Sequence, residues 1–153
     1  RSKKLDEKLD KIGEKLGGVE SNIGFHAEQF FQNTLAETLT FGNEKYEEMY
    51  PNLKSMKKNA DVEFDIVLVN GESVAIIEVK NRIHPKFVKD LVEKRLAMFR
   101  KTFSLFQNHK AYLGIAGFSF DDAVIEEAKE YGVGIIKQIG ESIEAETGHL
   151  KAY

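Results

Sequence analysis

One stretch of the sequence, residues 61–80 (DVEFDIVLVNGESVAIIEVK), constrains the fold more than any other part of the chain. It consists of two largely apolar runs joined by Asn70 and Gly71. An Asn-Gly pair between such runs is the strongest short-range signal for a tight two-residue hairpin turn. With these two residues as the loop, Val69 pairs with Glu72. The sequence therefore predicts an antiparallel hairpin.

This register divides the hairpin into a core face and a charged face, because strand side chains alternate between the two faces of a sheet. The predicted core face carries Val62, Phe64, Ile66, Leu68, Ser73, Ala75, Ile77 and Val79. The other face carries Asp61, Glu63, Asp65, Val67, Val69, Glu72, Val74, Ile76, Glu78 and Lys80. We expect Asp65 opposite Ile76, Glu63 opposite Glu78, and Asp65 as a diagonal neighbour of Glu78, about 7–8 Å apart at the backbone. Two carboxylates and Lys80 thus gather at one end of apolar strands.

The amino-acid composition limits the kinds of protein that this chain can be. The chain has 153 residues, of which 42% are hydrophobic and 10% aromatic, so it fits one domain with a sizeable core. It contains no cysteine, which excludes disulfides and thiolate metal sites. The sequence shows no signal peptide and no apolar run approaching the roughly 20 residues of a membrane span. We therefore expect a cytoplasmic protein with no membrane partner. Because it begins with Arg1, we expect a fragment of a longer protein.

The N-terminal segment has a heptad pattern. Apolar side chains recur at alternating spacings of four and three at Leu5, Leu9, Ile12, Leu16, Val19 and Ile23. This seam predicts a coiled-coil-like helix over residues 1–20. Both a helix packed on its own domain and a coil that forms a homodimer fit the pattern.

Helical periodicity next predicts a helix over residues 22–40, with Glu28 on the flank of its apolar stripe. The stripe consists of Ala27, Phe30, Phe31, Thr34, Leu35 and Thr38. We expect a weak strand over residues 43–50, ended by Pro51, and then a loop over residues 51–60.

After the hairpin, Pro85 indicates the first turn of a helix that runs to about residue 107. Residues 110–117 and 133–138 are apolar enough to be buried strands, and Asp121 can cap a helix over residues 121–131 between them. Residues 141–153 are expected to form a loosely ordered tail.

The predicted order is helix, three strands, helix, strand, helix, strand. The late strand–helix–strand pattern implies parallel pairing and a right-handed crossover. We therefore predict an α/β domain over residues 21–140, with a mixed sheet of about five strands and helices on both faces.

Asp65, followed by twelve residues and then Glu78, Val79 and Lys80, resembles the motif of the PD-(D/E)XK nuclease superfamily. That superfamily has the restriction-endonuclease-like fold, whose core has the element order just derived. The resemblance covers about residues 22–138. Phe64 stands where the motif is usually written with proline.

The resemblance also implies roles for these residues. Asp65 and Glu78, with the Val79 carbonyl, are the expected metal ligands. Glu28 matches the helix glutamate of many members and is expected to be a direct or water-mediated ligand. Lys80 is expected to position the attacking water.

Elementary chemistry agrees with such a site. Carboxylate oxygens suit Mg²⁺ or Mn²⁺, which keep several waters and take one or two carboxylates. The leading interpretation is Mg²⁺-dependent phosphodiester hydrolysis in nucleic acid, with DNA as the expected substrate. The alternative is a non-catalytic nuclease-like module for oligomerisation or for binding nucleic acid or a partner. The acids can also be read as cross-strand ion pairs, although Glu63 opposite Glu78 is unfavourable without a cation.

Other polar residues carry weaker signals. The net charge of −3 argues against a generally nucleic-acid-binding surface, but residues 80–110 are locally basic. The basic residues over 82–101 fit either phosphate contacts or a solvated helix face. His84 fits a helix cap or a phosphate contact. The histidines lack zinc-site spacing, and no GxGxxG loop indicates a nucleotide cofactor.

Overall fold

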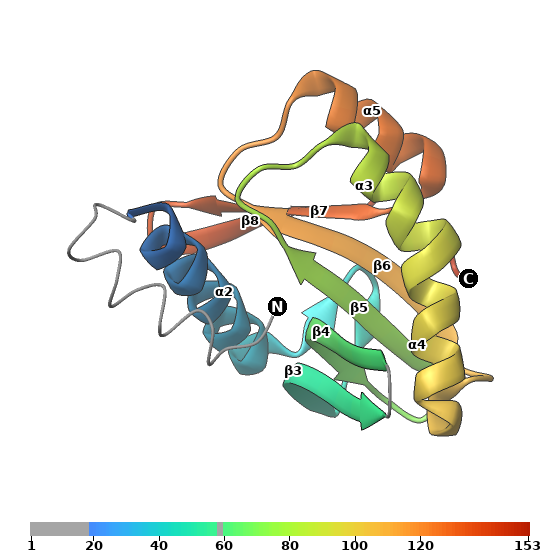
Figure 1. The fold of residues 1–153 in the computed structure, drawn as a ribbon. Coiled ribbons are helices and arrows are strands. Elements are labelled where there is room, and N and C mark those ends of the chain that lie inside the picture. Colours follow the sequence, from blue (N-terminus) through green and yellow to red (C-terminus); the bar gives the residue numbers. More distant parts are fainter. Residues whose placement is uncertain (1–18, 58–59) are drawn as a thin grey trace.

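The computed structural model describes residues 19–57 and 60–153, in which a six-stranded mixed sheet lies between helices (Figure 1). The strands, in the order in which they lie across the sheet, are β3 (Glu48–Lys57), β4 (Ala60–Val69), β5 (Ser73–Val79), β6 (Lys110–Gly117), β7 (Gly134–Ile139) and β8 (Ser142–Glu146). The predicted α/β class is confirmed, with six strands in place of about five. The coiled-coil-like helix predicted over residues 1–20 lies outside the described residues, apart from its last two positions.

The sheet is antiparallel at both edges and parallel in the middle. β5 pairs with β6 and β6 with β7 in parallel, as the strand–helix–strand pattern predicts. β3, β4 and β5 are successive antiparallel neighbours, and β8 is antiparallel to β7. The predicted hairpin is therefore next to the central parallel strands, which lets both faces of β5 be buried.

Helices cover both faces of the sheet, as predicted (Figure 1). Helix α2 (Val19–Thr38) packs on one face, where its Phe31 and Leu35 belong to the same core cluster as Leu68 and Ile77 of the sheet. The other face is covered by α3 (Pro85–Asp90), α4 (Leu96–Thr102) and α5 (Asp122–Tyr131). The central strands are therefore buried on both faces between the two layers of helices.

The segment after the hairpin is less regular than the single helix predicted over residues 85–107. A π-helical turn, Leu91–Arg95, joins α3 to α4, and a 3-10 turn, Ser104–Phe106, follows α4. His84 is the N-cap of α3, and its Nδ1 accepts a hydrogen bond from the Lys86 N–H at 3.1 Å. The capping role of His84 is confirmed. Asp121 occupies the N-cap position of α5, but its side chain makes no capping hydrogen bond.

The hairpin register differs from the prediction by two residues. Val69 pairs with Val74 instead of Glu72. The Asn70 N–H donates to the Ser73 carbonyl, and the Asn70 Oδ1 accepts from the N–H groups of Glu72 and Ser73. Asn70 therefore starts the turn as its first residue, and Gly71 lacks the positive φ that a hairpin loop of Asn-Gly requires.

The predicted core face of β4 is wrong for Val62 and Phe64. These two side chains pack in the cluster beneath α4, whereas Ile66 and Leu68 face α2. The regular alternation of faces along β4 therefore breaks at Asp65, which lies between Phe64 and Ile66. The β3–β4 pairing also lacks a residue pair at this position. The physical reason lies in the neighbouring strand, where Asn52 adopts a φ of 51° and bends β3.

Two further predictions are wrong. Residues 51–57 belong to β3 instead of a loop, and the chain passes through Pro51 because β3 is the edge strand, where a missing N–H is tolerated. Residues 40–45, partly assigned to a weak strand, form the small β1 (Thr40–Phe41) and β2 (Glu44–Lys45) hairpin.

The predicted tail is ordered. It forms β8, and its end returns to the sheet, where the Tyr153 N–H donates to the Ala111 carbonyl at 2.8 Å. Within the described residues, no helix combines the length and apolarity needed to cross a bilayer.

Candidate metal centre

The acidic residues of the motif lie where the pairing of β4 with β5 ends. The last regular pair is Ile66 with Ile77. Beyond this pair, backbone N–H groups of the two strands donate to side-chain carboxylates instead of to backbone carbonyls. The Glu78 Oε2 accepts a hydrogen bond from the Asp65 N–H at 3.2 Å, and the Asp65 Oδ2 accepts one from the Val79 N–H at 2.9 Å. The two carboxylates are therefore directly opposed instead of diagonal, and each is fixed to the backbone of the other strand.

Helix α2 brings Glu28 to the same place through a short hydrogen-bond chain. The Gln32 Nε2 donates to the Asp65 carbonyl at 3.1 Å and to the Asn52 Oδ1 at 3.0 Å. The Asn52 Nδ2 in turn donates to the Glu28 Oε1 at 2.5 Å. Glu28 and Gln32 are both 5% exposed and lie one helical turn apart. The Asn52 side chain, at the bend of β3, thus connects Glu28 to Gln32, and Gln32 connects in turn to the backbone of Asp65.

The Arg95 side chain contacts the motif from the helices on the other face of the sheet, opposite α2. The Arg95 Nη2 lies 2.5 Å from the Glu78 Oε1 and also donates to the Glu63 carbonyl at 2.7 Å. The guanidinium carbon lies 4.3 Å from the centre of the Phe64 ring. Glu78 is only 3% exposed, so this ion pair neutralises a buried charge.

Lys80 lies away from the carboxylates. Its Nζ is 4.5 Å from the centre of the Phe87 ring on α3, and its side chain is exposed. Within residues 19–57 and 60–153, Lys80 forms no ion pair with a carboxylate. The structure thus joins Asp65, Glu78 and Val79 by hydrogen bonds, links Glu28 to them only through Asn52 and Gln32, and leaves the Lys80 ammonium on the aromatic ring.

The surroundings of the Asp65 carboxyl disfavour its ionised form. Burial raises the pKa of the Asp65 carboxyl well above its ordinary value, and the nearby charges of Glu78 and Glu28 raise this pKa further. The hydrogen bond from the Val79 N–H acts in the opposite direction. The Asp65 carboxyl therefore holds a proton more readily than an ordinary aspartate does.

The donor atoms are of the chemical type that a hard divalent cation takes. Asp65, Glu78 and the Val79 carbonyl offer only oxygen atoms, and Mg²⁺ needs no more than one or two carboxylates beside its waters. In the part of the chain that the structure describes, no three Asp, Glu or His side chains converge closely enough to enclose a metal. Glu28 is held by Asn52, which suits a water-mediated contact better than direct ligation.

Sequence reasoning did not assign Gln32, Asn52 and Arg95 to the site. Asn52 falls in a predicted loop, so nothing pointed to it. Arg95 falls among basic residues interpreted as a phosphate-binding or solvated face. The sequence did indicate that Arg95 faces the core, because it lies four residues after Leu91 and four before Phe99, on the buried stripe of the helix.

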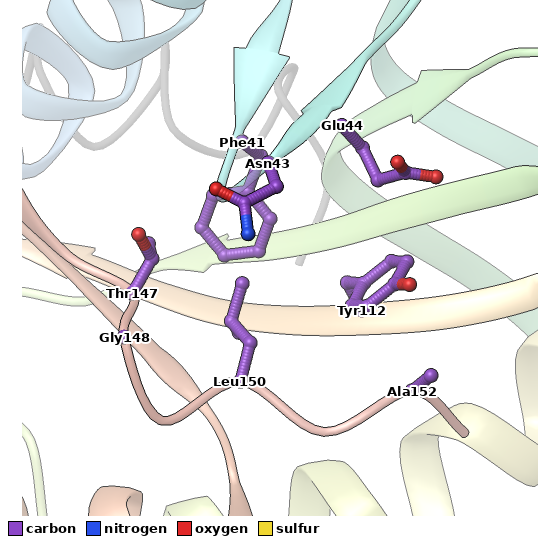
Figure 2. A pocket seen from close by; sticks show the side chains of 8 residues that line it. All are labelled: Phe41, Asn43, Glu44, Tyr112, Thr147, Gly148, Leu150 and Ala152. Atoms are coloured by element: carbon purple, nitrogen blue, oxygen red, sulfur yellow. The ribbon is translucent and has the colours of Figure 1, made fainter.

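A separate pocket of about 310 Å³ lies beside the start of β5 and β6, remote from the carboxylates at the end of β5 (Figure 2). Phe41, Glu44, Tyr112 and Leu150 are among its lining residues. None of the residues predicted for the metal centre lines it, and its single carboxylate comes from Glu44. This pocket is therefore not part of the candidate metal centre.

Comparison with known proteins gives a likeness to solved structures alone. No protein-family model matches the chain, and no curated protein matches it. Among solved structures it is similar to the small subunit of the heterodimeric restriction endonuclease R.BspD6I, with a TM-score of 0.43 and 15% sequence identity. The match covers 86% of this chain and 72% of that subunit. The assignment of a site here depends on the contacts described above.

Proposed function

We propose that this chain is a metal-dependent nuclease that hydrolyses phosphodiester bonds, with DNA as its expected substrate. The observation that carries the proposal is the directly opposed pair of Asp65 and Glu78, held by reciprocal hydrogen bonds to the strand backbone. In their ionised forms, Asp65, Glu78 and the nearby Glu28 face the cation Arg95, and a divalent cation would neutralise the remaining negative charge. The resemblance of the motif and of the element order to the PD-(D/E)XK superfamily supports the same activity.

The proposed roles follow from the contacts. Asp65 and Glu78, with the Val79 carbonyl, would hold Mg²⁺ or Mn²⁺, and Glu28 would contribute through a water. The bound ion would lower the pKa of its water and neutralise charge on the phosphoryl group. Lys80 would leave the Phe87 ring and orient the attacking water.

The second candidate function is a non-catalytic nuclease-like module that binds nucleic acid or a partner. Two contacts favour it: Arg95 already neutralises Glu78, and Lys80 rests on Phe87. Such a module needs no metal at the carboxylates. Self-association through the predicted N-terminal helix is a related proposal, and a comparison of solution mass with and without residues 1–20 tests it.

The deciding experiment is a cleavage assay on plasmid and single-stranded DNA with Mg²⁺ or Mn²⁺. The variants are Asp65→Asn and Lys80→Ala, with Asp61→Asn as a control because Asp61 is exposed on the same strand. We expect cleavage by the unmodified chain and by the control, and a loss of at least a hundredfold in the other two. Asparagine keeps an oxygen that accepts from the Val79 N–H, so the loss would report on charge.

Two outcomes would contradict the proposal. If the unmodified chain cuts neither DNA and binds no Mn²⁺ in calorimetry, the non-catalytic module becomes the better reading. If cleavage survives both substitutions, its source lies outside this site.

A further inference from the structure

Arg95 is held at the candidate metal centre by three different groups. Its Nη2 donates to the Glu78 carboxylate and to the Glu63 carbonyl, and its guanidinium lies over the Phe64 ring. The carbonyl and the ring belong to β4, so the cation is anchored to the sheet independently of Glu78. A rotation of the Arg95 side chain away from Glu78 therefore breaks more than one contact.

Arg95 is the last residue of the π-helical turn. Leu91–Arg95 lies between α3 and α4, and π turns inside helices occur often at functional sites. Its last two residues, both basic, differ sharply in surroundings. The Lys94 side chain is 72% exposed and pairs with Asp90 at 3.5 Å, whereas that of Arg95 is 26% exposed and contacts Glu78. The chain therefore offers a matched control one residue away.

We propose that Arg95 sets the affinity of the candidate centre for divalent cations, because it is the resting counter-ion of Glu78 with which a metal must compete. This inference rests on the proposed function. One Glu78 oxygen is bound to Arg95 and the other to the Asp65 N–H. A metal that approaches this carboxylate meets a fixed positive charge in a partly buried site, where repulsion between like charges is stronger than in water.

The direction of the effect separates this role from a merely structural one. If Arg95 only supported the fold, its loss would disorder the carboxylates and weaken metal binding. As a competitor, Arg95 lowers the affinity for metal, so its loss strengthens binding although it destabilises the metal-free protein.

The test uses the full chain, freed of metal with a chelator and titrated with MnCl₂ in a calorimeter at low ionic strength. We compare the unmodified chain with Arg95→Gln, Arg95→Met and the control Lys94→Met. Both Arg95 variants are expected to bind Mn²⁺ at least tenfold more tightly, and the control within twofold of the unmodified chain. Adding Glu78→Gln to Arg95→Gln is expected to abolish the gain.

Each other outcome overturns the inference in a recognisable way. Equal or weaker binding by an Arg95 variant that unfolds cooperatively overturns it and leaves the proposed function standing. Binding by none of the proteins overturns both the inference and the metal centre. If Arg95→Met fails to fold, Arg95→Gln decides the matter, because its amide can still donate a hydrogen bond.

Discussion

Replacing Arg95 with methionine should destabilise the metal-free protein through one identifiable cause, an uncompensated charge on Glu78. Glu78 is 3% exposed, and Arg95 is its cationic partner at 2.5 Å. Methionine retains much of the aliphatic packing of arginine but cannot neutralise the carboxylate. The substitution therefore isolates the ion pair better than alanine would.

The expected magnitude follows from the burial of the two partners. Removing one member of a fully buried ion pair costs about 3–5 kcal/mol. The Arg95 side chain is 26% exposed, so water compensates part of the loss and we expect about 2–3 kcal/mol. For a domain of this size, that corresponds to a fall in Tm of roughly 4–12 °C.

Chemical denaturation in the presence of EDTA measures this free energy, and a double-mutant cycle identifies its origin. The cycle comprises Arg95→Met, Glu78→Gln and the double variant, with Lys94→Met as the surface control. In the double variant no buried charge is left unpaired, so its loss of stability should be smaller than the sum of the two single losses. If Arg95→Met costs no more than Lys94→Met, Arg95 is not the counter-ion of Glu78 and the argument fails.

Three further predictions concern the pH dependence and the packing. Because the pKa of Asp65 is raised in the folded state, the folded chain binds more protons than the unfolded chain above the ordinary carboxyl pKa, so stability falls as pH rises through this window. Asp65→Asn removes this dependence, and its Tm relative to the unmodified chain should rise with pH in EDTA; a constant difference would contradict the shift. Phe99→Ala should cost about 3–5 kcal/mol in urea denaturation, because this fully buried ring packs on Phe64 at 5.3 Å, and a cost below about 1 kcal/mol would refute the described packing. Gly114→Val should lower Tm, because a Cβ there would lie 2.7 Å from the Phe41 ring, and Phe41→Ala in the same chain should recover part of the loss.

The sequence predicted that Asp65 and Glu78 lie near each other, but it placed them diagonally instead of directly opposite. The Asn-Gly signal and the apolar runs identified the hairpin, and a register error of two residues leaves alternation unchanged. The error mattered at Asp65, which lies directly opposite Glu78 because the turn begins one residue later than predicted, at Asn70, whose side chain accepts hydrogen bonds within the turn. Hydrogen bonds of this kind compete with the use of Asn70 as a loop residue, and the Asn-Gly pair does not tell the two turns apart.

Other features left little trace in the sequence. β8 reads S-I-E-A-E and is exposed along most of its length, so no apolar alternation marks it as a strand. The phase change in β4 depends on Asn52 in the neighbouring strand, and the sequence of β4 does not contain that information. The π turn is equally hidden, because helical periodicity identifies a buried stripe but not a widened turn.

The reciprocal bonds between Asp65, Glu78 and the strand backbone place two separate demands on the same side chains. The sheet needs only an oxygen that accepts from the Val79 N–H and another that accepts from the Asp65 N–H. Amides meet this demand as well as acids do, whereas a divalent cation needs the charge. A variant with asparagine and glutamine at these positions should therefore keep the hydrogen bonds of the hairpin, lose the ion pair with Arg95 and lose any metal chemistry, whereas alanine should lose the hydrogen bonds as well. The loss of a function and the loss of a fold can thus be separated at a single pair of residues.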